Sequence, residues 1–176
     1  MSEALESVDV LIIGAGLSGI GGACQLRRSC PERSFTIFES RAASGGTWDL
    51  FRYPGIRSDS DMYTFSYGFK PWRDPSAIAD GAKILNYIRE TAAEYDVERH
   101  IQYQRKVVSA RWSSTEKRGT VTAECGNTDE TVTVSCQFIF SCSGYYDYEQ
   151  GYTPEFSGIN NFAGTIVHPQ QWPKDL

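Results

Sequence analysis

The chain has 176 residues, of which 40% are hydrophobic, 13% aromatic and 22% charged. This length predicts about one domain, and the composition excludes disordered, collagen-like and disulfide-framework proteins. Seventeen basic against 22 acidic residues give a net charge of -5, so we expect no basic surface for nucleic acid or anionic lipid. The composition therefore indicates a protein that handles a small molecule.

The cysteines and the N-terminus predict a cytoplasmic protein. Five cysteines, an odd number without a C-x-x-C pair, argue against a closed disulfide set and against a metal site. Residues 1–6 are acidic where a signal peptide is basic. No apolar run approaches the roughly 18 residues that span a bilayer, so we expect no integral membrane segment.

The first elements are a strand, a glycine turn, a helix and a second strand. Residues 8–13 are apolar and largely β-branched, which is typical of a strand buried on both faces of a parallel sheet. The turn 14–19 reads G-x-G-x-x-G, and a helix-compatible stretch follows until Pro31. A second apolar run, 35–38, ends at Glu39.

The remaining elements are less regular. Residues 44–75 crowd glycine, proline, arginine and aromatic residues together, which favours a binding loop over a linker. Apolar spacing over 81–95 predicts an amphipathic helix with Asp80 as its cap. Alternation over 101–136 predicts an antiparallel meander, and 138–142 predicts another buried strand. The expected fold is α/β, with a Rossmann-like parallel sheet and an inserted meander.

The glycine turn has the context that dinucleotide binding requires. Gly14 allows a tight turn, Gly16 lets the backbone approach a pyrophosphate, and Gly19 lets helix and strand pack closely. The following helix offers free N–H groups to the phosphates. Glu39, at the end of the next strand, can accept hydrogen bonds from an adenosine ribose. Chance glycines at a strand–helix turn are the alternative, which this context disfavours.

Glu39 also indicates which dinucleotide binds. Its carboxylate would repel the 2′-phosphate of NADP, so this turn should hold FAD or NAD. Arg41 can soften that repulsion, but an arginine at a strand end is usually solvated surface.

Two further motifs make the sequence similar to a known family. Gly45-Gly46-Thr47-Trp48, followed by RYPGIRSD at 52–59, resembles the flavin-contacting segment of class B flavoprotein monooxygenases. Residues 162–173 match the Baeyer–Villiger fingerprint F-x-G-x-x-x-H-x-x-x-W-P at every specified position. Within that family, 47–62 is most similar to the branch with the ethionamide-activating and long-chain alkane monooxygenases.

The resemblance implies a role for each matching residue. Asp59 is the catalytic candidate, because it would position electrostatically an arginine that acts beside the flavin and has no match here. The other implied contacts are Gly14, Gly16, Ser18 and Gly19 with the pyrophosphate, Glu39 with the ribose, Gly46, Thr47, Trp48, Asp49 and Leu50 with the flavin, the Val107 backbone with the adenine, and Arg57, Ser58 and Asp59 with NADPH.

The resemblance also implies a reaction with FAD and NADPH as cofactors. In this family NADPH reduces the flavin, oxygen adds to it, and the flavin peroxide attacks a small organic ketone, sulfur or nitrogen compound. A non-catalytic dinucleotide-binding module is the alternative, but such a module has no use for Gly46-Thr47-Trp48 or for the fingerprint. A simple NAD dehydrogenase is disfavoured by the meander, which interrupts regular βαβ alternation.

Several of these residues also have plain structural interpretations. Trp48 can be a core ring, Asp59 and Asp61 can be turn caps, and His168 can be structural, without acid or base work. The tyrosines at 145, 146, 148 and 152 are most simply interface or packing rings.

The expected organisation is a partial FAD-binding domain, 1–150, followed by a linker, 151–176, that carries the fingerprint. The NADPH half of the family and the segment that completes the FAD sheet have no match here. We therefore expect an N-terminal portion whose sheet is incomplete at its C-terminal end and which is inactive alone; the sequence leaves its oligomeric state open.

Overall fold

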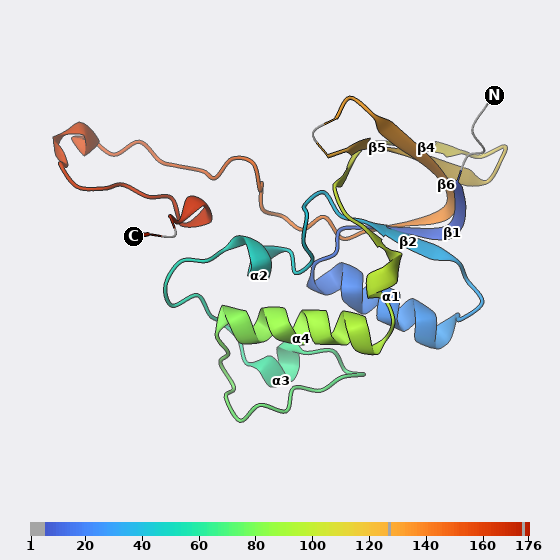
Figure 1. Ribbon diagram of the computed structural model, residues 1–176, viewed down its shortest axis with the longest axis horizontal. Helices are drawn as coiled ribbons and strands as arrows, with labels where there is room; N and C mark the ends of the chain where they lie inside the picture. The colour runs from blue at the N-terminus through green and yellow to red at the C-terminus, as the bar shows by residue number, and fades with distance from the viewer. Residues whose placement is uncertain (1–5, 127, 174) are drawn as a thin grey trace.

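The computed structural model describes residues 6–126, 128–173 and 175–176, and these residues build one mixed sheet (Figure 1). The six strands lie in the order β3-β2-β1-β6-β5-β4. Strand β1 pairs in parallel with both β2 and β6, whereas β4, β5 and β6 pair antiparallel. The expected parallel sheet with an antiparallel meander is confirmed. The strands are β1 Glu6–Ile13, β2 Phe35–Phe38, β3 Ile101–Gln102, β4 Arg105–Ser113, β5 Arg118–Cys125 and β6 Thr131–Ser141.

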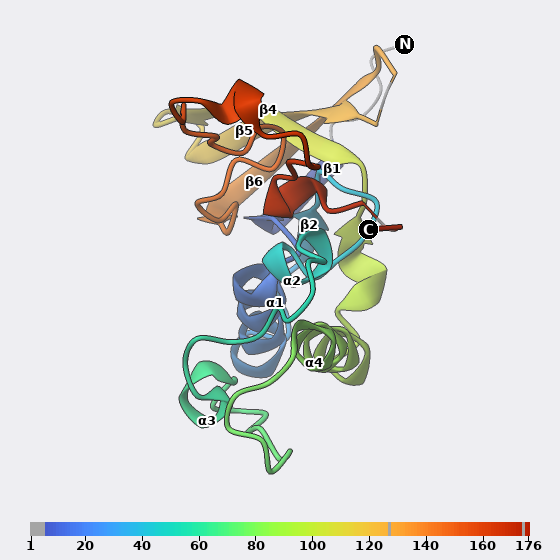
Figure 2. The ribbon, with the colours of Figure 1, turned by 90° about the vertical axis from the view of Figure 1, so that its left-hand side faces the viewer.

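Two long helices cover one side of the parallel strands (Figures 1 and 2). Helix α1, Leu17–Ser29, and helix α4, Gly81–Glu94, share a buried core with β1 and β2 that includes Ile12, Ile20 and Ile84. A second core, with Leu11 and Val121, lies between the parallel strands and the meander. Because Leu11 and Ile12 point to opposite faces, β1 is buried on both sides, as its apolar run predicts.

The predicted antiparallel meander over 101–136 begins too early, because its first residues belong to the parallel part of the sheet. Strand β3 pairs in parallel with β2, placing Ile101 beside Ile37. Helix α4 supplies the crossover that a parallel neighbour needs. The meander itself consists of β4, β5 and β6.

The predicted strands 131–136 and 138–142 are one strand in the structure. The first half of β6 pairs with β5, up to Cys136, and its second half continues beside β1. The expectation that the second half is buried is also wrong, because Phe138 is 60% and Phe140 40% exposed. Strand β5 does not extend alongside these positions, so one edge of β6 and its rings remain accessible.

The loop 44–75 contains two one-turn helices that periodicity cannot reveal. They are α2, Thr47–Leu50, and α3, Met62–Phe65. Asp61 caps α3 by accepting a hydrogen bond from the Thr64 N–H at 2.9 Å, which confirms its interpretation as a cap. Asp80 occupies the N-cap position of α4, but its side chain makes no capping hydrogen bond with the described residues.

The chain after β6 leaves the carboxyl end of the sheet (Figure 1). It contains only two short 3-10 helices among its described residues, Ile159–Asn161 and Pro169–Gln171; a third, Glu98–His100, follows α4. Whether residues 151–176 act as a linker between domains stays a prediction. No helix within the described ranges is long and apolar enough to cross a membrane.

Candidate functional site

The glycine turn lies between β1 and α1, at the carboxyl end of the parallel strands. Gly14 adopts a φ of 99°, which L side chains rarely adopt, and its N–H donates to the Phe38 carbonyl at 2.8 Å. Gly16 is the N-cap of α1, so the first-turn N–H groups after it have no carbonyl within the helix to bind. A side chain on Gly19 would clash with the Gly14 carbonyl oxygen. The turn thus exposes the first N–H groups of α1, and the glycines leave no side chain that would keep a ligand away from them.

Glu39 lies beside this turn at the end of β2. The residue is 4% exposed, and its carboxylate accepts from the Ala15 N–H at 2.7 Å, the Arg41 N–H at 2.9 Å and the Ser40 hydroxyl at 3.4 Å. The Arg105 N–H donates to the Glu39 carbonyl at 2.9 Å. Because Val107 follows two residues later in β4, the strand predicted to meet the adenine starts at the ribose end of the site.

The flavin-side segment approaches the turn through two glycines. The Gly45 N–H donates to the Ala15 carbonyl at 2.9 Å. Gly46 has a φ of 53°, and a Cβ built on it would lie 3.0 Å from the Gly16 Cα. Gly16 and Gly46 therefore face each other, backbone against backbone, where a pyrophosphate-bearing ligand would pass from the turn to α2.

The side chains of α2 point in different directions. Trp48 packs against the core and meets the Phe65 ring edge-on, at 6.0 Å between centroids, as its interpretation as a core ring expects. The Thr47 hydroxyl lies 3.3 Å from the Tyr148 hydroxyl. Tyr148 therefore contacts the flavin-side segment through its hydroxyl. Its interpretation as a packing ring did not include this polar contact.

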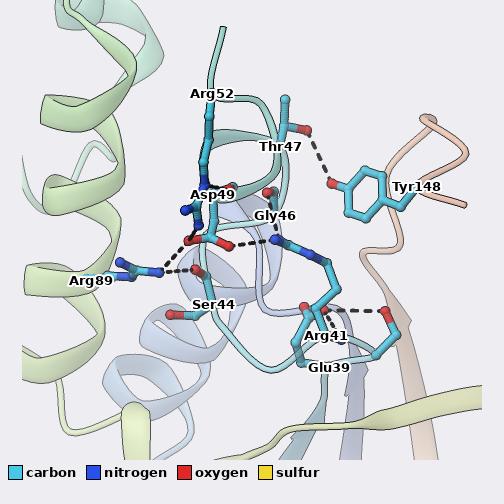
Figure 3. Close-up of polar contacts among 10 residues, drawn as sticks. Glu39, Arg41, Ser44, Gly46, Thr47, Asp49, Arg52, Arg89 and Tyr148 are labelled. Atoms are coloured by element: carbon cyan, nitrogen blue, oxygen red, sulfur yellow. Dashed lines mark hydrogen bonds and ion pairs between the residues drawn. The ribbon is translucent and has the colours of Figure 1, made fainter. Parts of the chain in front are cut away.

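Asp49 is the centre of an ion-pair cluster (Figure 3). Its side chain is 5% exposed, and its carboxylate binds the guanidinium groups of Arg41 at 2.6 Å, Arg89 at 2.8 Å and Arg52 at 3.4 Å. The carboxylate is thus committed to protein partners, and a flavin contact of Asp49 or Leu50 stays a prediction. The view of Arg41 as solvated surface is wrong, because Arg41 is half-buried and paired.

The sequence carries no local signal for this cluster. Arg89 lies on α4, 40 positions from Asp49, and α4 shows only the apolar spacing of an amphipathic helix. Arg89 also donates to the Ser44 carbonyl at 3.0 Å. It therefore fixes both ends of the flavin-side segment.

The NADPH-side residues lie on the loop before α3. Ser58 is buried, and its backbone and hydroxyl both bind Ala79, at 2.9 and 3.1 Å. Arg57 and Asp59 flank it and are exposed. The pKa of the Tyr146 hydroxyl is raised, mainly by its hydrogen bond with Tyr145 and by burial, with a smaller contribution from the Asp59 charge. The catalytic role of Asp59 stays a prediction.

The fingerprint residues pack on glycines. The His168 ring lies where a Gly151 side chain would be, and its Nδ1 accepts from the Gln170 N–H at 3.2 Å. The Phe162 ring occupies the corresponding space at Gly164. These contacts agree with a structural role for His168.

Comparisons with known proteins agree with this geometry. Residues 7–175 match the family model described as flavin-binding monooxygenase-like. The chain is 53% identical over 171 residues to the FAD-containing monooxygenase EthA of Mycobacterium tuberculosis, covering 97% of this chain and 35% of that protein. It is 45% identical to the probable FAD-binding monooxygenase AlmA of Acinetobacter baylyi, with 97% and 34% covered.

Solved structures show the same fold. An oxidized steroid monooxygenase bound to NADP superposes with a TM-score of 0.78 at 32% identity, covering 96% of this chain and 32% of that one. A cyclohexanone monooxygenase, at 24% identity and a TM-score of 0.79, shares the fold. The chain spans about a third of the length of these proteins. With the family match extending over almost its whole length, the chain belongs to the flavin-binding monooxygenase-like family.

Proposed function

We propose that this chain is the FAD-binding part of an FAD-dependent, NADPH-consuming monooxygenase. The observation that carries the proposal is the approach of Gly46 to Gly16 beside Glu39, because this joins a ribose carboxylate, a phosphate turn and a flavin-side segment in one continuous path. Support comes from relatives named FAD-containing monooxygenases and from a structural neighbour solved in complex with FAD and NADP.

The residues present fit FAD. The pyrophosphate would lie on the N–H groups after Gly16. The ribose hydroxyls would donate to Glu39, whose Oε2 accepts, among the described residues, only from the Ala15 N–H and keeps a lone pair, while Oε1 accepts from Arg41 and Ser40. The Val107 backbone would meet the adenine, and Gly46, Thr47 and the α2 backbone would border the flavin. When bound, the flavin takes a hydride from the nicotinamide and activates oxygen.

The chain's own residues set the order of the binding path. The Ala15 N–H holds the Glu39 carboxylate at the start of the turn, which fixes the ribose end. The Gly45–Ala15 hydrogen bond then holds the flavin-side segment at the other end. Arg57 and Asp59, exposed on the adjoining loop, are in our proposal the contacts for the nicotinamide end of NADPH.

The proposed substrates of the whole protein are molecular oxygen and a small organic ketone or an electron-rich sulfur or nitrogen compound. We place the protein in the cytoplasm, which the five free cysteines support. A non-catalytic dinucleotide-binding module is less well supported, because the ordered segment 45–50 extends beyond what the adenosine half of a dinucleotide requires.

A cofactor titration tests the proposal. The purified chain is titrated with FAD and, separately, with NADPH, while the quenching of flavin or tryptophan fluorescence is recorded. We expect saturable FAD binding that NADPH does not displace, and weaker FAD binding by Glu39→Gln. A chain that binds NADPH in preference to FAD would refute the proposal.

A further inference from the structure

Arg41 starts next to the ribose carboxylate. Its backbone N–H, three positions after the end of β2, donates to the Glu39 carboxylate at 2.9 Å. An arginine in this neighbourhood is the feature with which related turns accommodate a 2′-phosphate on the adenosine ribose. A free Arg41 guanidinium would therefore counteract the repulsion that Glu39 exerts on such a phosphate.

The Arg41 guanidinium points elsewhere (Figure 3). One of its amino groups donates to the Asp49 carboxylate at 2.6 Å, and the other donates to the Gly46 carbonyl at 3.2 Å. The guanidinium also lies 5.8 Å from the centre of the Tyr148 ring. The side chain is 22% exposed, so the Asp49 pair is largely removed from solvent.

Asp49 is the anion of this cluster, and its position is fixed from both sides. Arg89 on α4 donates to the same carboxylate at 2.8 Å, while Arg52, which follows α2, lies at 3.4 Å and is mostly exposed. Three guanidinium groups share one carboxylate. Removal of its charge would leave Arg41 with a carbonyl and an aromatic ring as partners, both weaker than a carboxylate.

We propose that Asp49 is a specificity-determining residue that holds Arg41 away from the adenosine ribose. The turn thereby keeps its selectivity for a ribose with a free 2′-hydroxyl, as in FAD, against one that carries a 2′-phosphate. This inference rests on the proposed function, because it requires a dinucleotide on the turn with its ribose at Glu39. It assigns to Asp49 a task other than direct contact with the flavin.

The selectivity follows from competition for one cation. In the native chain, a bound 2′-phosphate would lie near Glu39. Arg41 could pair with that phosphate only by breaking its 2.6 Å ion pair with Asp49. In Asp49→Asn the ion pair is replaced at most by a hydrogen bond to a neutral amide oxygen, so a 2′-phosphate becomes the strongest acceptor for Arg41. The variant should therefore bind the 2′-phosphorylated ligand better, with little change for the unphosphorylated one.

Calorimetric titration of the chain with ADP-ribose and with 2′-phospho-ADP-ribose measures this selectivity. We expect the native chain to prefer ADP-ribose, and Asp49→Asn to reduce that preference by roughly tenfold, the size of one charge-assisted hydrogen bond. Adding Arg41→Gln to Asp49→Asn should restore the native preference. Adding Arg52→Gln instead is the matched control and should not restore it, since Arg52 is exposed and does not adjoin Glu39.

Arg41→Gln alone keeps the role of Asp49 falsifiable even where Asp49→Asn fails to fold. We expect it to leave the native preference unchanged, because Arg41 does not face the ribose. A preference that widens in Arg41→Gln, or one that is unchanged in folded Asp49→Asn, overturns the role of Asp49 while leaving the proposed function intact. Absence of ADP-ribose binding to the native chain would instead count against the proposed function.

Discussion

At the scale of single residues, the glycines of the first turn are required for different physical reasons. Gly14 needs its positive φ, and Gly19 needs the absence of a side chain next to the Gly14 carbonyl. Gly16 has neither constraint, because its φ of -81° suits any residue and a methyl group on it would come no nearer than 3.6 Å to the Gly46 Cα. The protein itself tolerates a side chain at Gly16, so its requirement lies with the ligand.

Gly16→Ala should therefore fold normally and lose FAD affinity. The methyl group would stand at the point of the turn where the backbone must come within hydrogen-bonding distance of the pyrophosphate. We expect an unfolding midpoint close to that of the native chain and a loss of FAD affinity of about tenfold or more, as for one lost hydrogen bond to a charged group. Urea unfolding and FAD titration give the two values.

Gly19→Ala is the matched control for this prediction. Its methyl group would clash with the Gly14 carbonyl oxygen and would not stand in the ligand path. Gly19→Ala should therefore lower the free energy of unfolding of the chain even without FAD. Native-like FAD affinity in Gly16→Ala would show that the pyrophosphate does not approach this point.

Cys24 provides a prediction about protonation. Burial disfavours the charged thiolate and raises the pKa of the Cys24 thiol to about 11. At pH 8 only about one molecule in a thousand then carries the reactive thiolate at this position. In mass spectrometry after brief alkylation of the folded chain at pH 8, Cys24, which is also inaccessible to the reagent, should be unmodified while half-buried Cys30 is labelled. Equal labelling at pH 8 would contradict this assignment, and labelling in guanidinium provides the control.

At the scale of elements, the sequence predicts correctly those helices and strands whose formation depends on neighbouring residues. The run 8–13, the glycine turn, the first helix and the strand 35–38 were correct because each is specified by neighbouring residues. Strand β3 was misassigned because two residues carry no information about their partner, which the α4 crossover selects.

The second half of β6 shows a different limit. Its apolar residues predict burial, but burial depends on whether another strand or helix covers Phe138, which no local pattern encodes. The same holds for the site. The glycines and Glu39 were found from spacing, whereas the Asp49 cluster joins residues 3, 8 and 40 positions apart and required the fold.

Gly151→Ala tests how the fingerprint segment is held. The added methyl group would displace the His168 ring and weaken the contact between the two ends of the segment 151–168. We expect the imidazole NMR signals of His168 to shift, those of His100 to stay in place, and proteolysis within the segment to accelerate several-fold. Gly68→Ala is the control, because nothing lies within 4 Å of a side chain there. Unchanged His168 signals in Gly151→Ala would show that this packing is not formed.

At the scale of the whole molecule, an apolar surface accompanies an open strand edge. Among the described residues, no strand pairs with the β5-side edge of 137–141, where Phe138 and Phe140 are accessible. Unpaired edges with exposed rings favour association between copies. Phe138→Ser should therefore lower the self-association of the chain at high concentration, measured by sedimentation velocity. Ile78→Ser, which removes an exposed residue from the loop before α4, is the control and should have little effect. Equal association in both variants would locate the contact elsewhere.

The last prediction is that this 176-residue chain forms no oxygenated product when supplied with FAD, NADPH and a ketone or thioether. The chain spans about a third of the length of its relatives. Its described residues contain one glycine turn at a strand–helix junction, and in our proposal that turn holds FAD, which leaves no second turn for the NADPH phosphates.

The arginines near the proposed flavin path are already committed. Arg52 binds the Asp49 carbonyl at 3.0 Å, and Arg41 and Arg89 bind the Asp49 carboxylate, so none of the three is free to stabilise charge on an oxygen adduct. Without NADPH held beside it, a reduced flavin reacting with oxygen would release hydrogen peroxide instead of oxygenating a substrate. NADPH consumption with product analysis measures the outcome. Product formed in proportion to the NADPH consumed would contradict this prediction and would mean that the chain contains its own catalytic groups. Arg57, exposed beside Asp59, would then be the first residue to mutate.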